Sequence, residues 1–171
     1  MNVPNLENNG AIQRRVLAAT SVSYVLVLLD TSIVNVALDR ISVSLATQIA
    51  GLQWVMNAYT LAFASLLLTG GTLGDRWGAR NVYLAGLMVF TLASTICGVA
   101  ADLPSLIAAR VLQGVGAAML VPCSLKLINH ACPEPEQRAR AVGIWVGCGG
   151  VAMAAGPLIG GVLIHLLGSG G

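Results

Sequence analysis

Five long apolar segments alternate with short polar ones along this chain. They cover residues 16–38, 52–73, 82–101, 105–128 and 141–164, and a helix of about 20 residues is enough to cross the hydrocarbon layer of a bilayer. Because lipid offers no hydrogen-bond partner to an exposed backbone, we expect each segment to be an α-helix. The pattern predicts an all-α integral membrane protein with a helical bundle over residues 16–164, a polar tail at 1–15 and an outer tail at 165–171.

Composition agrees with this pattern. The 171 residues are 56% hydrophobic and 9% charged, with a mean hydropathy of +0.81, which is too apolar for a soluble domain of this size. The first segment is too long for a cleaved signal peptide and carries Asp30 deep inside it. We therefore expect a multi-pass protein whose first helix is retained.

The basic residues gather at one set of predicted helix ends. Those on this side are Arg14, Arg15, Arg76, Arg80, Lys126, Arg138 and Arg140, whereas Arg40 lies in the opposite loops. The positive-inside rule then predicts a cytoplasmic N-terminus. Since these residues are spread over three short segments, we expect no nucleic acid as a partner. The apolar composition predicts membrane lipid as a partner instead.

Two charged residues within the apolar segments are candidates for chemistry. Asp30 lies eight residues from the outer end of the first segment, and Arg110, with Gln113 beside it, lies five residues inside the fourth. At a rise of about 1.5 Å per residue these depths are about 12 and 8 Å, so the two charges can meet. A guanidinium would favour the ionised carboxylate and burial the protonated one, a balance that permits proton coupling. A static ion pair that fixes helix packing is the alternative interpretation.

The stretch from Gly71 to Arg80, which we expect to be a loop, carries more charge than a short turn needs. Anchoring on the cytoplasmic side explains Arg76 and Arg80 but leaves Asp75 unexplained. A carboxylate at a helix junction is well suited to accept hydrogen bonds from the N-terminus of another helix. We therefore interpret Asp75 as part of a conformational latch, with Gly71 and Gly78 allowing the tight turn.

The fifth segment is the richest in glycine, and its small residues form two nearly opposite faces. One face holds Gly143, Gly147, Gly150, Ala154 and Gly161, and the other holds Gly149, Ala152, Gly156 and Gly160. Small residues let neighbouring helices approach closely, so we expect this helix to lie between two partners. Pro157 removes a backbone donor, which makes Gly156–Pro157 a candidate bend, although a kink without function remains possible.

Four motifs together resemble those of the major facilitator superfamily, in particular the drug:proton antiporters that carry fourteen helices. The motifs are Leu29-Asp-Thr-Ser-Ile-Val-Asn-Val-Ala-Leu38, Gly71 to Arg80, Arg110 to Ala118, and Gly156-Pro-Leu-Ile-Gly-Gly161, with Trp54 and Tyr59 as further matches in the second helix. The resemblance covers residues 14–163. It implies the N-terminal bundle of this family's fold.

The same resemblance implies a role for each motif. Proton or substrate coupling is assigned to Asp30 and proton transfer to Arg110, and we group Gln113 with them because it lies beside Arg110. The conformational latch is assigned to Gly71, Asp75, Arg76, Gly78 and Arg80, and the antiporter hinge to Gly156, Pro157, Gly160 and Gly161.

Three positions depart from the family pattern. Ala79 stands where a basic residue is usual, Asp39 replaces a common proline, and Ala152 replaces a frequent glycine. Length is a larger departure, because the family builds its pathway between two six-helix bundles and this chain supplies five helices. We therefore expect a partial chain, ending in a cut at residues 168–171, whose partner is the missing C-terminal bundle.

The resulting hypothesis is a proton-coupled efflux transporter of hydrophobic, often cationic compounds in the cell membrane. The alternative is a small membrane protein or remnant that transports nothing and acts by helix packing with partners. An enzyme is not expected, since His130 and His165 are isolated and no nucleophile, base and orienting group appear together. No metal site or cofactor is expected, because the cysteines and histidines lack ligand spacing.

Overall fold

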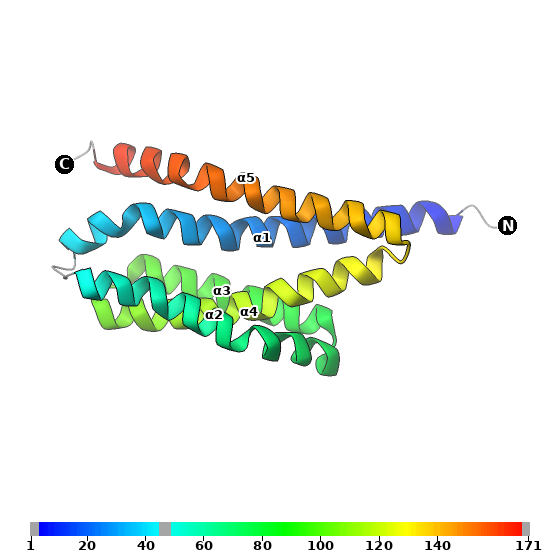
Figure 1. The fold of residues 1–171 in the computed structure, drawn as a ribbon, viewed down its shortest axis with the longest axis horizontal. Coiled ribbons are helices and arrows are strands. Elements are labelled where there is room, and N and C mark those ends of the chain that lie inside the picture. Colours follow the sequence, from blue (N-terminus) through cyan, green and yellow to red (C-terminus); the bar gives the residue numbers. More distant parts are fainter. Residues whose placement is uncertain (1–3, 45–48, 169–171) are drawn as a thin grey trace.

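The computed structural model describes residues 4–44 and 49–168, with side chains at 10–35, 49–159 and 161–162. These ranges form five helices and no strand: α1 (Pro4–Ser44), α2 (Ile49–Trp77), α3 (Ala79–Val99), α4 (Leu103–Ala131) and α5 (Pro135–Gly168) (Figure 1). All five are long and apolar enough to cross a membrane. The prediction of an all-helical membrane protein is confirmed.

The helices extend beyond the apolar segments that predicted them. α1 begins at Pro4 and α5 ends at Gly168, so most of the stretch 1–15 and part of the stretch 165–171 are helical. Hydropathy marks only the part of a helix that crosses hydrocarbon, whereas the backbone hydrogen bonds continue into flanking polar residues. Proline is compatible with the start of α1 and α5, because the first N–H groups of a helix have no intrahelical partner.

The expected loop between the second and third helices is almost entirely helical. α2 continues through Gly71 and Asp75 to Trp77, and α3 begins at Ala79. Only Gly78 interrupts the two helices, with a φ of 86°, a backbone conformation that favours glycine because it has no Cβ. The polar motif is therefore the end of a helix and a one-residue turn.

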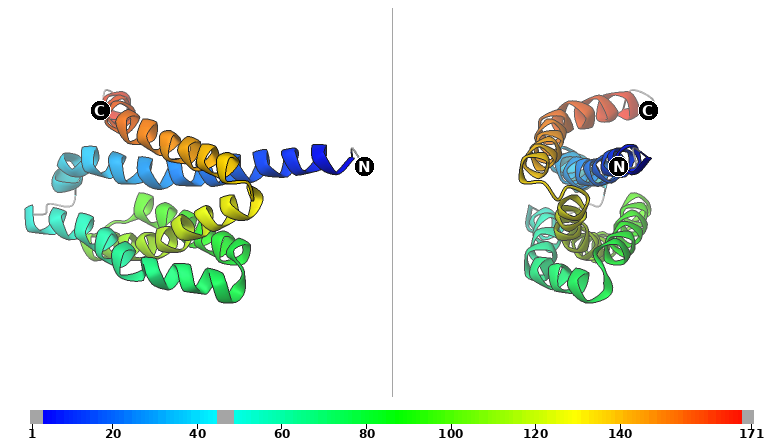
Figure 2. Two further views of the ribbon diagram at one scale, coloured as in Figure 1. Left: turned by 45° about the vertical axis from the view of Figure 1, so that its right-hand side comes forward. Right: turned by 90° about the vertical axis from the view of Figure 1, so that its right-hand side faces the viewer.

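The helices form two layers: α2, α3 and α4 make one, and α1 and α5 make the other. α4 packs against α2, α3 and α1, whereas α5 packs mainly along α1. Figure 1 shows α1 and α5 side by side, and the end-on view of Figure 2 places α1 between α5 and α4. α1 is thus the element that joins the two layers.

Small residues of α4 allow the backbones of its neighbours to approach closely. A Cβ placed on Gly114 would lie 2.5 Å from the carbonyl oxygen of Tyr59 in α2, and one on Gly116 would lie 2.7 Å from the backbone nitrogen of Phe90 in α3. No side chain fits such gaps without moving a helix. Glycine at these two positions therefore sets the spacing of the α2–α3–α4 layer.

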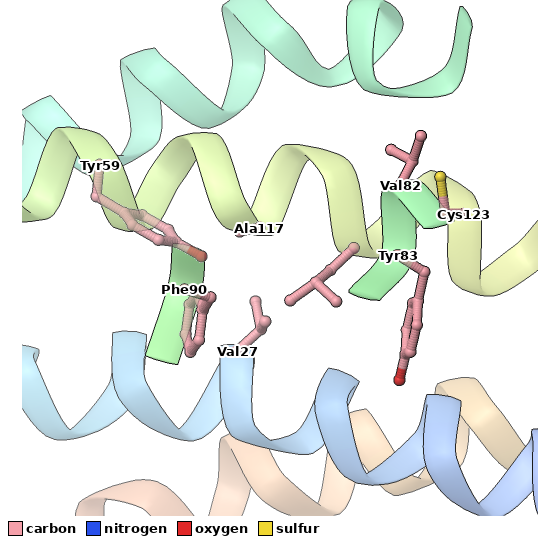
Figure 3. Close-up of a cluster of buried hydrophobic side chains, with 8 residues drawn as sticks. Val27, Tyr59, Val82, Tyr83, Phe90, Ala117 and Cys123 are labelled. Carbon is pink, nitrogen blue, oxygen red and sulfur yellow. The ribbon is translucent and has the colours of Figure 1, made fainter. Parts of the chain in front are cut away.

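Buried side chains from all of the first four helices make the main core. Its members are Val27, Tyr59, Val82, Tyr83, Phe90, Ala117, Leu120 and Cys123. Figure 3 shows Val27 pointing from α1 toward the other members of this cluster. Because α1 contributes to it, the core holds the two layers together.

A second set of contacts attaches α5 to α1. The ring of Trp145 in α5 stacks on Tyr24 with centroids 3.9 Å apart, and its Nε1 donates to the carbonyl oxygen of Thr20 at 3.2 Å. Trp145 is part of a small buried cluster with Ile128 and Cys132 at the end of α4. Trp145 therefore attaches α5 both to α1 and to the end of α4.

Candidate functional site

The two charges inside the bundle do meet. Nη1 of Arg110 lies 2.6 Å from Oδ2 of Asp30, and the same nitrogen donates to Oε1 of Gln113 at 2.8 Å. Nε2 of Gln113 donates to Oδ1 of Asp30, also at 2.8 Å. The three side chains close a ring of hydrogen bonds in which both carboxylate oxygens accept.

Helix geometry explains why the ring forms. Arg110 and Gln113 are three residues apart in α4, so their side chains lie on the same face, about one turn apart. That face is turned toward α1, which presents Asp30 at the matching depth. Their depths in the sequence allowed Asp30 and Arg110 to meet, and the structure brings them together, while the coupling role of the three residues remains a prediction.

The ring is almost completely removed from solvent. Arg110 is 2% exposed, Gln113 is fully buried, and the side chain of Asp30 is 17% exposed. A buried charge without a partner is costly, whereas this carboxylate and guanidinium neutralise each other. Asp30 is the most accessible member of the ring.

Two further residues extend the ring. The guanidinium carbon of Arg110 lies 4.5 Å from the centre of the Tyr59 ring, within cation–π range. The thiol of Cys97 in α3 donates to Oε1 of Gln113 at 3.4 Å. The sequence matched Tyr59 to the second helix without assigning it this contact, and it gave Cys97 no role, because neither contact follows from spacing along one helix.

One atom of the site lacks a hydrogen-bond partner. Nε of Arg110 is buried and makes no hydrogen bond within the part of the chain that the structure describes. The guanidinium group of Arg110 lies over the Tyr59 ring. The arginine is therefore held on one edge by Asp30 and Gln113 and on its face by an aromatic ring.

The residues assigned to the latch lie at the end of α2, in the turn at Gly78 and at the start of α3. Asp75 forms an ion pair with Lys126 of α4, with Nζ 2.6 Å from Oδ1, and Nζ also donates to the carbonyl oxygen of Gly71. Asp75 thus pairs with a lysine side chain of α4, whereas the sequence analysis expected it to accept hydrogen bonds from the N-terminus of another helix. Arg76 and Arg80 are exposed and make no ion pair with a side chain in the described ranges.

The two glycine faces of α5 differ in their surroundings. A Cβ on Gly149 would collide with Tyr24, and one on Gly156 would collide with Ser32, so this face packs on α1. The opposite face is bare: a Cβ on Gly143, Gly147, Gly150 or Gly161 would have nothing within 4 Å among the described residues. One of the two expected neighbours is found.

The proposed hinge is partly described. Pro157 is exposed and lies inside α5, which continues to Gly168. The surroundings of Gly160 lie outside the described side chains. The bend at Gly156–Pro157 therefore stays a prediction.

A bundle of membrane-length helices that buries a carboxylate–guanidinium pair defines the class of multi-pass membrane proteins with an ionisable interior site. The family model described as Major Facilitator Superfamily matches residues 20–169 of this chain. The chain belongs to the major facilitator superfamily. The family resemblance stated from the four motifs is confirmed.

Several curated relatives are similar over most of the chain. It is 39% identical to a methylenomycin A resistance protein of Bacillus subtilis over 170 residues, 95% of this chain and 36% of the relative. It is 47% identical to the cephamycin export protein CmcT of Amycolatopsis lactamdurans over 89% of this chain and 31% of the relative. It is 42% identical to the multidrug resistance protein Stp of Mycobacterium tuberculosis over 86% of this chain and 28% of the relative. The chain thus spans about a third of the length of these relatives.

Proposed function

We propose that this chain is part of a proton-coupled drug efflux transporter that exchanges protons for hydrophobic, often cationic compounds. The observation that carries the proposal is the buried ring of Asp30, Arg110 and Gln113. The names of the relatives described above, which refer to antibiotic resistance, multidrug resistance and export, support the same function. The transported compound and the complete pathway belong to the longer protein.

The ring suggests how one proton can change the site. Protonation of Asp30 removes the negative charge that faces Arg110 and replaces an acceptor by a donor. The ion pair is then lost, and Arg110 keeps Gln113 and Tyr59 as partners. Deprotonation restores a carboxylate that attracts a cation, so the two protonation states of Asp30 favour different occupants and different helix arrangements.

The decisive experiment replaces Asp30 by asparagine, which keeps the shape and can still accept from Gln113 but cannot carry the proton. In everted membrane vesicles with an imposed proton gradient, addition of a cationic drug to the unaltered protein should release protons. The Asp30→Asn variant of the complete protein should show no drug-driven proton movement. Unchanged exchange in this variant would refute the proposal.

Asp102 offers a matched control for this experiment. It is an exposed carboxylate between α3 and α4, and it is not a member of the buried ring. Asp102→Asn removes the same charge while keeping a residue that caps helices well. We expect its drug-driven proton movement to match that of the unaltered protein, which separates a role of Asp30 from a general effect of lost charge.

The other motifs take supporting roles in this proposal. The Asp75–Lys126 ion pair ties α2 to α4 at the arginine-rich end, so the group of Gly71, Asp75, Arg76, Gly78 and Arg80 stabilises one arrangement of the helices. Gly156, Pro157, Gly160 and Gly161 act as the hinge of α5. The protein lies in the cell membrane with its arginine-rich end on the cytoplasmic side. Transport proceeds without making or breaking covalent bonds.

A second function is favoured by one observation, the bare glycine face of α5. In that case the five helices act as a small membrane protein that associates with other helices. Detection of the native product with an antibody to residues 1–15 distinguishes the two. A species several times larger than 17.5 kDa supports the transporter, whereas a product of 17.5 kDa supports association, and cross-linking that finds monomers alone would exclude the latter.

A further inference from the structure

The side-chain amide of Gln113 has one orientation that satisfies all of its neighbours in the buried ring. Its oxygen Oε1 accepts from Nη1 of Arg110 at 2.8 Å and from the thiol of Cys97 at 3.4 Å, while its Nε2 donates to Oδ1 of Asp30 at 2.8 Å. Turning the amide over would place its NH2 group against a guanidinium, which has no acceptor, and its oxygen against a carboxylate oxygen. Gln113 is fully buried, so water cannot relieve either conflict.

Cys97 holds this amide from a third helix. Its thiol belongs to α3, whereas Arg110 and Gln113 belong to α4 and Asp30 belongs to α1. An amide oxygen is only an acceptor, so the thiol is the donor in this contact. Because the two donors on Oε1 come from different helices, the thiol keeps the amide oriented when the guanidinium shifts.

The two carboxylate oxygens of Asp30 are not equivalent. Oδ2 faces Nη1 of Arg110 at 2.6 Å, and Oδ1 faces Nε2 of Gln113. A proton turns either oxygen into a donor, which then opposes the donor that it faces. At Oδ1 this conflict persists, because the amide is fixed. At Oδ2 it is relieved by a shift of the guanidinium, which keeps Gln113 and the Tyr59 ring as partners.

The titratable side chains that face Asp30 come from three helices. They are Arg110 of α4, Tyr59 of α2 and Cys97 of α3. Where α5 passes this part of α1, it presents Gly156 to Ser32. The attraction within the ion pair is lost whichever oxygen of Asp30 is protonated, so the hydrogen-bond pattern decides between the two oxygens.

We propose that Cys97 is a positioning residue for proton coupling: together with Arg110 it fixes the amide of Gln113, and the fixed amide directs the incoming proton to Oδ2 of Asp30. The proton comes from water and forms an O–H bond at Oδ2, while Arg110 keeps its own protons. Each protonation then separates Asp30 from Arg110. A proton on Oδ1 would leave Oδ2 in contact with Arg110 and the two helices joined. This inference rests on the proposed function, because it takes the protonation of Asp30 as its starting point.

Infrared difference spectroscopy of the complete protein in lipid films, between neutral and acidic pH, shows which oxygen is protonated. The band to follow is the carboxyl C=O stretch that Asp30→Asn abolishes. With the proton on Oδ2, the carbonyl oxygen is Oδ1, which accepts from the neutral amide of Gln113. Gln113→Met keeps a side chain of similar length without an amide, so nothing then opposes a proton on Oδ1.

In Gln113→Met the carbonyl oxygen should therefore become Oδ2, which accepts from the charged Arg110. Because a charge-assisted hydrogen bond is the stronger one, the C=O band should move to lower frequency. A band that stays in place would show that the proton already lies on Oδ1 in the unaltered protein. A move to higher frequency would show that the proton stays on Oδ2 without the amide. Either of these results would overturn the proposal.

The role of Cys97 is tested by removing its donor and restoring it. Cys97→Ala should raise the share of molecules with the proton on Oδ1 by about two- to fivefold, seen as growth of the lower-frequency band, because one weak hydrogen bond is lost. Cys97→Ser supplies a hydroxyl donor and should return the spectrum to that of the unaltered protein. Cys148→Ala is the matched control, since Cys148 is also half-buried but is not part of the ring. Equal spectra for Cys97→Ala and Cys148→Ala would exclude Cys97 as a positioning residue.

The same measurements separate this inference from the proposed function. In everted vesicles, Cys97→Ala should slow drug-driven proton movement and Cys97→Ser should restore it. Absence of any carboxyl band that Asp30→Asn removes would overturn the inference and the proposed function together. A band from Asp30 that responds neither to Gln113→Met nor to Cys97→Ala would overturn the inference alone.

Discussion

Arg110 is the residue whose charge is hardest to accommodate in this bundle. It is 2% exposed, and the cost of removing an ion from water is several kcal/mol even after the surroundings relax. Asp30, Gln113 and the ring of Tyr59 offset this cost together. The intact ring therefore adds little net stability. Loss of one charged member leaves the other charge buried without a partner, and the free-energy cost of burying that charge is then no longer offset.

Replacement of Arg110 by leucine leaves Asp30 with Gln113 as its remaining partner. We expect Arg110→Leu to lower the free energy of unfolding by about 3 kcal/mol, because a carboxylate then stays largely buried without its counter-charge. Adding Asp30→Asn should recover part of the loss. Reversible denaturation in mixed micelles measures both, and strictly additive losses in the double-mutant cycle would show that the two side chains are not coupled.

The buried ring also shows which parts of a site can be predicted from one sequence. Asp30 and Arg110 could be placed at similar depth, because depth in a bilayer follows from position in an apolar segment. Tyr59 and Cys97 could not be assigned, since their contacts depend on how α2 and α3 are rotated around α4. Lys126 was assigned to the arginine-rich end, but its pairing with Asp75 depends on the packing of α2 against α4.

The same distinction applies to the helices. Hydropathy predicted five helices, and the described ranges form five helices, but it missed the polar helical turns at their ends, where backbone hydrogen bonding continues without apolar residues. The two faces of α5 were predicted from periodicity, because small residues repeat at helical spacing. Which face meets α1 could not be predicted, since both faces carry glycine.

The close contact between α3 and α4 gives a prediction with a matched control. A Cβ on Gly116 would lie 2.7 Å from the backbone nitrogen of Phe90, whereas one on Gly98 in α3 has nothing within 4 Å among the described residues. We expect Gly116→Ala to cost about 1–3 kcal/mol by forcing the helices apart. Gly98→Ala should be neutral or stabilising by about 0.5–1 kcal/mol, because alanine favours a helix. Equal effects in mixed-micelle denaturation would contradict this account.

The start of α4 makes stability depend on pH. Asp102 is the N-cap residue and accepts from the backbone nitrogen of Ser105 at 2.8 Å, and the hydrogen bonds from Ser105 hold the pKa of Asp102 below its ordinary value. The pKa of Asp102 is lower in the folded state than in the unfolded state. The ionised cap therefore contributes to the stability of the fold above the unfolded-state pKa, and this contribution is lost as pH falls through the folded-state pKa.

Asp102→Ala should therefore lower the midpoint of thermal unfolding at neutral pH, and this difference should disappear in acid. Asn at the same position caps the helix without a charge, so Asp102→Asn should show a smaller difference at neutral pH, and its advantage over Asp102→Ala should not change with pH. Thermal unfolding in detergent, followed by circular dichroism across the acid range, measures both variants. A difference for Asp102→Ala that persists unchanged in acid would exclude the charged cap as its cause.

At the scale of the whole molecule, the two layers are unequally supported. α4 is buried on three sides by α1, α2 and α3, whereas α5 rests mainly on α1 and has a bare opposite face. Elements with fewer packed neighbours open at lower free energy than the core. We therefore expect α5 to separate before the α2–α3–α4 layer loses its packing.

Two probes follow these events separately during a titration with sodium dodecyl sulfate. Trp145 is buried against α1, so a variant with Trp54→Phe and Trp77→Phe reports the separation of α5 through its fluorescence. Cys123 of α4 is buried against α2. Thiol labelling of a variant that keeps Cys123 as its single cysteine therefore reports the opening of the α2–α3–α4 layer. The Trp145 signal should change at a lower detergent fraction, because fewer contacts hold α5. Coincident transitions would mean that α1 transmits the loss of α5 to the whole bundle, which then unfolds as one cooperative unit.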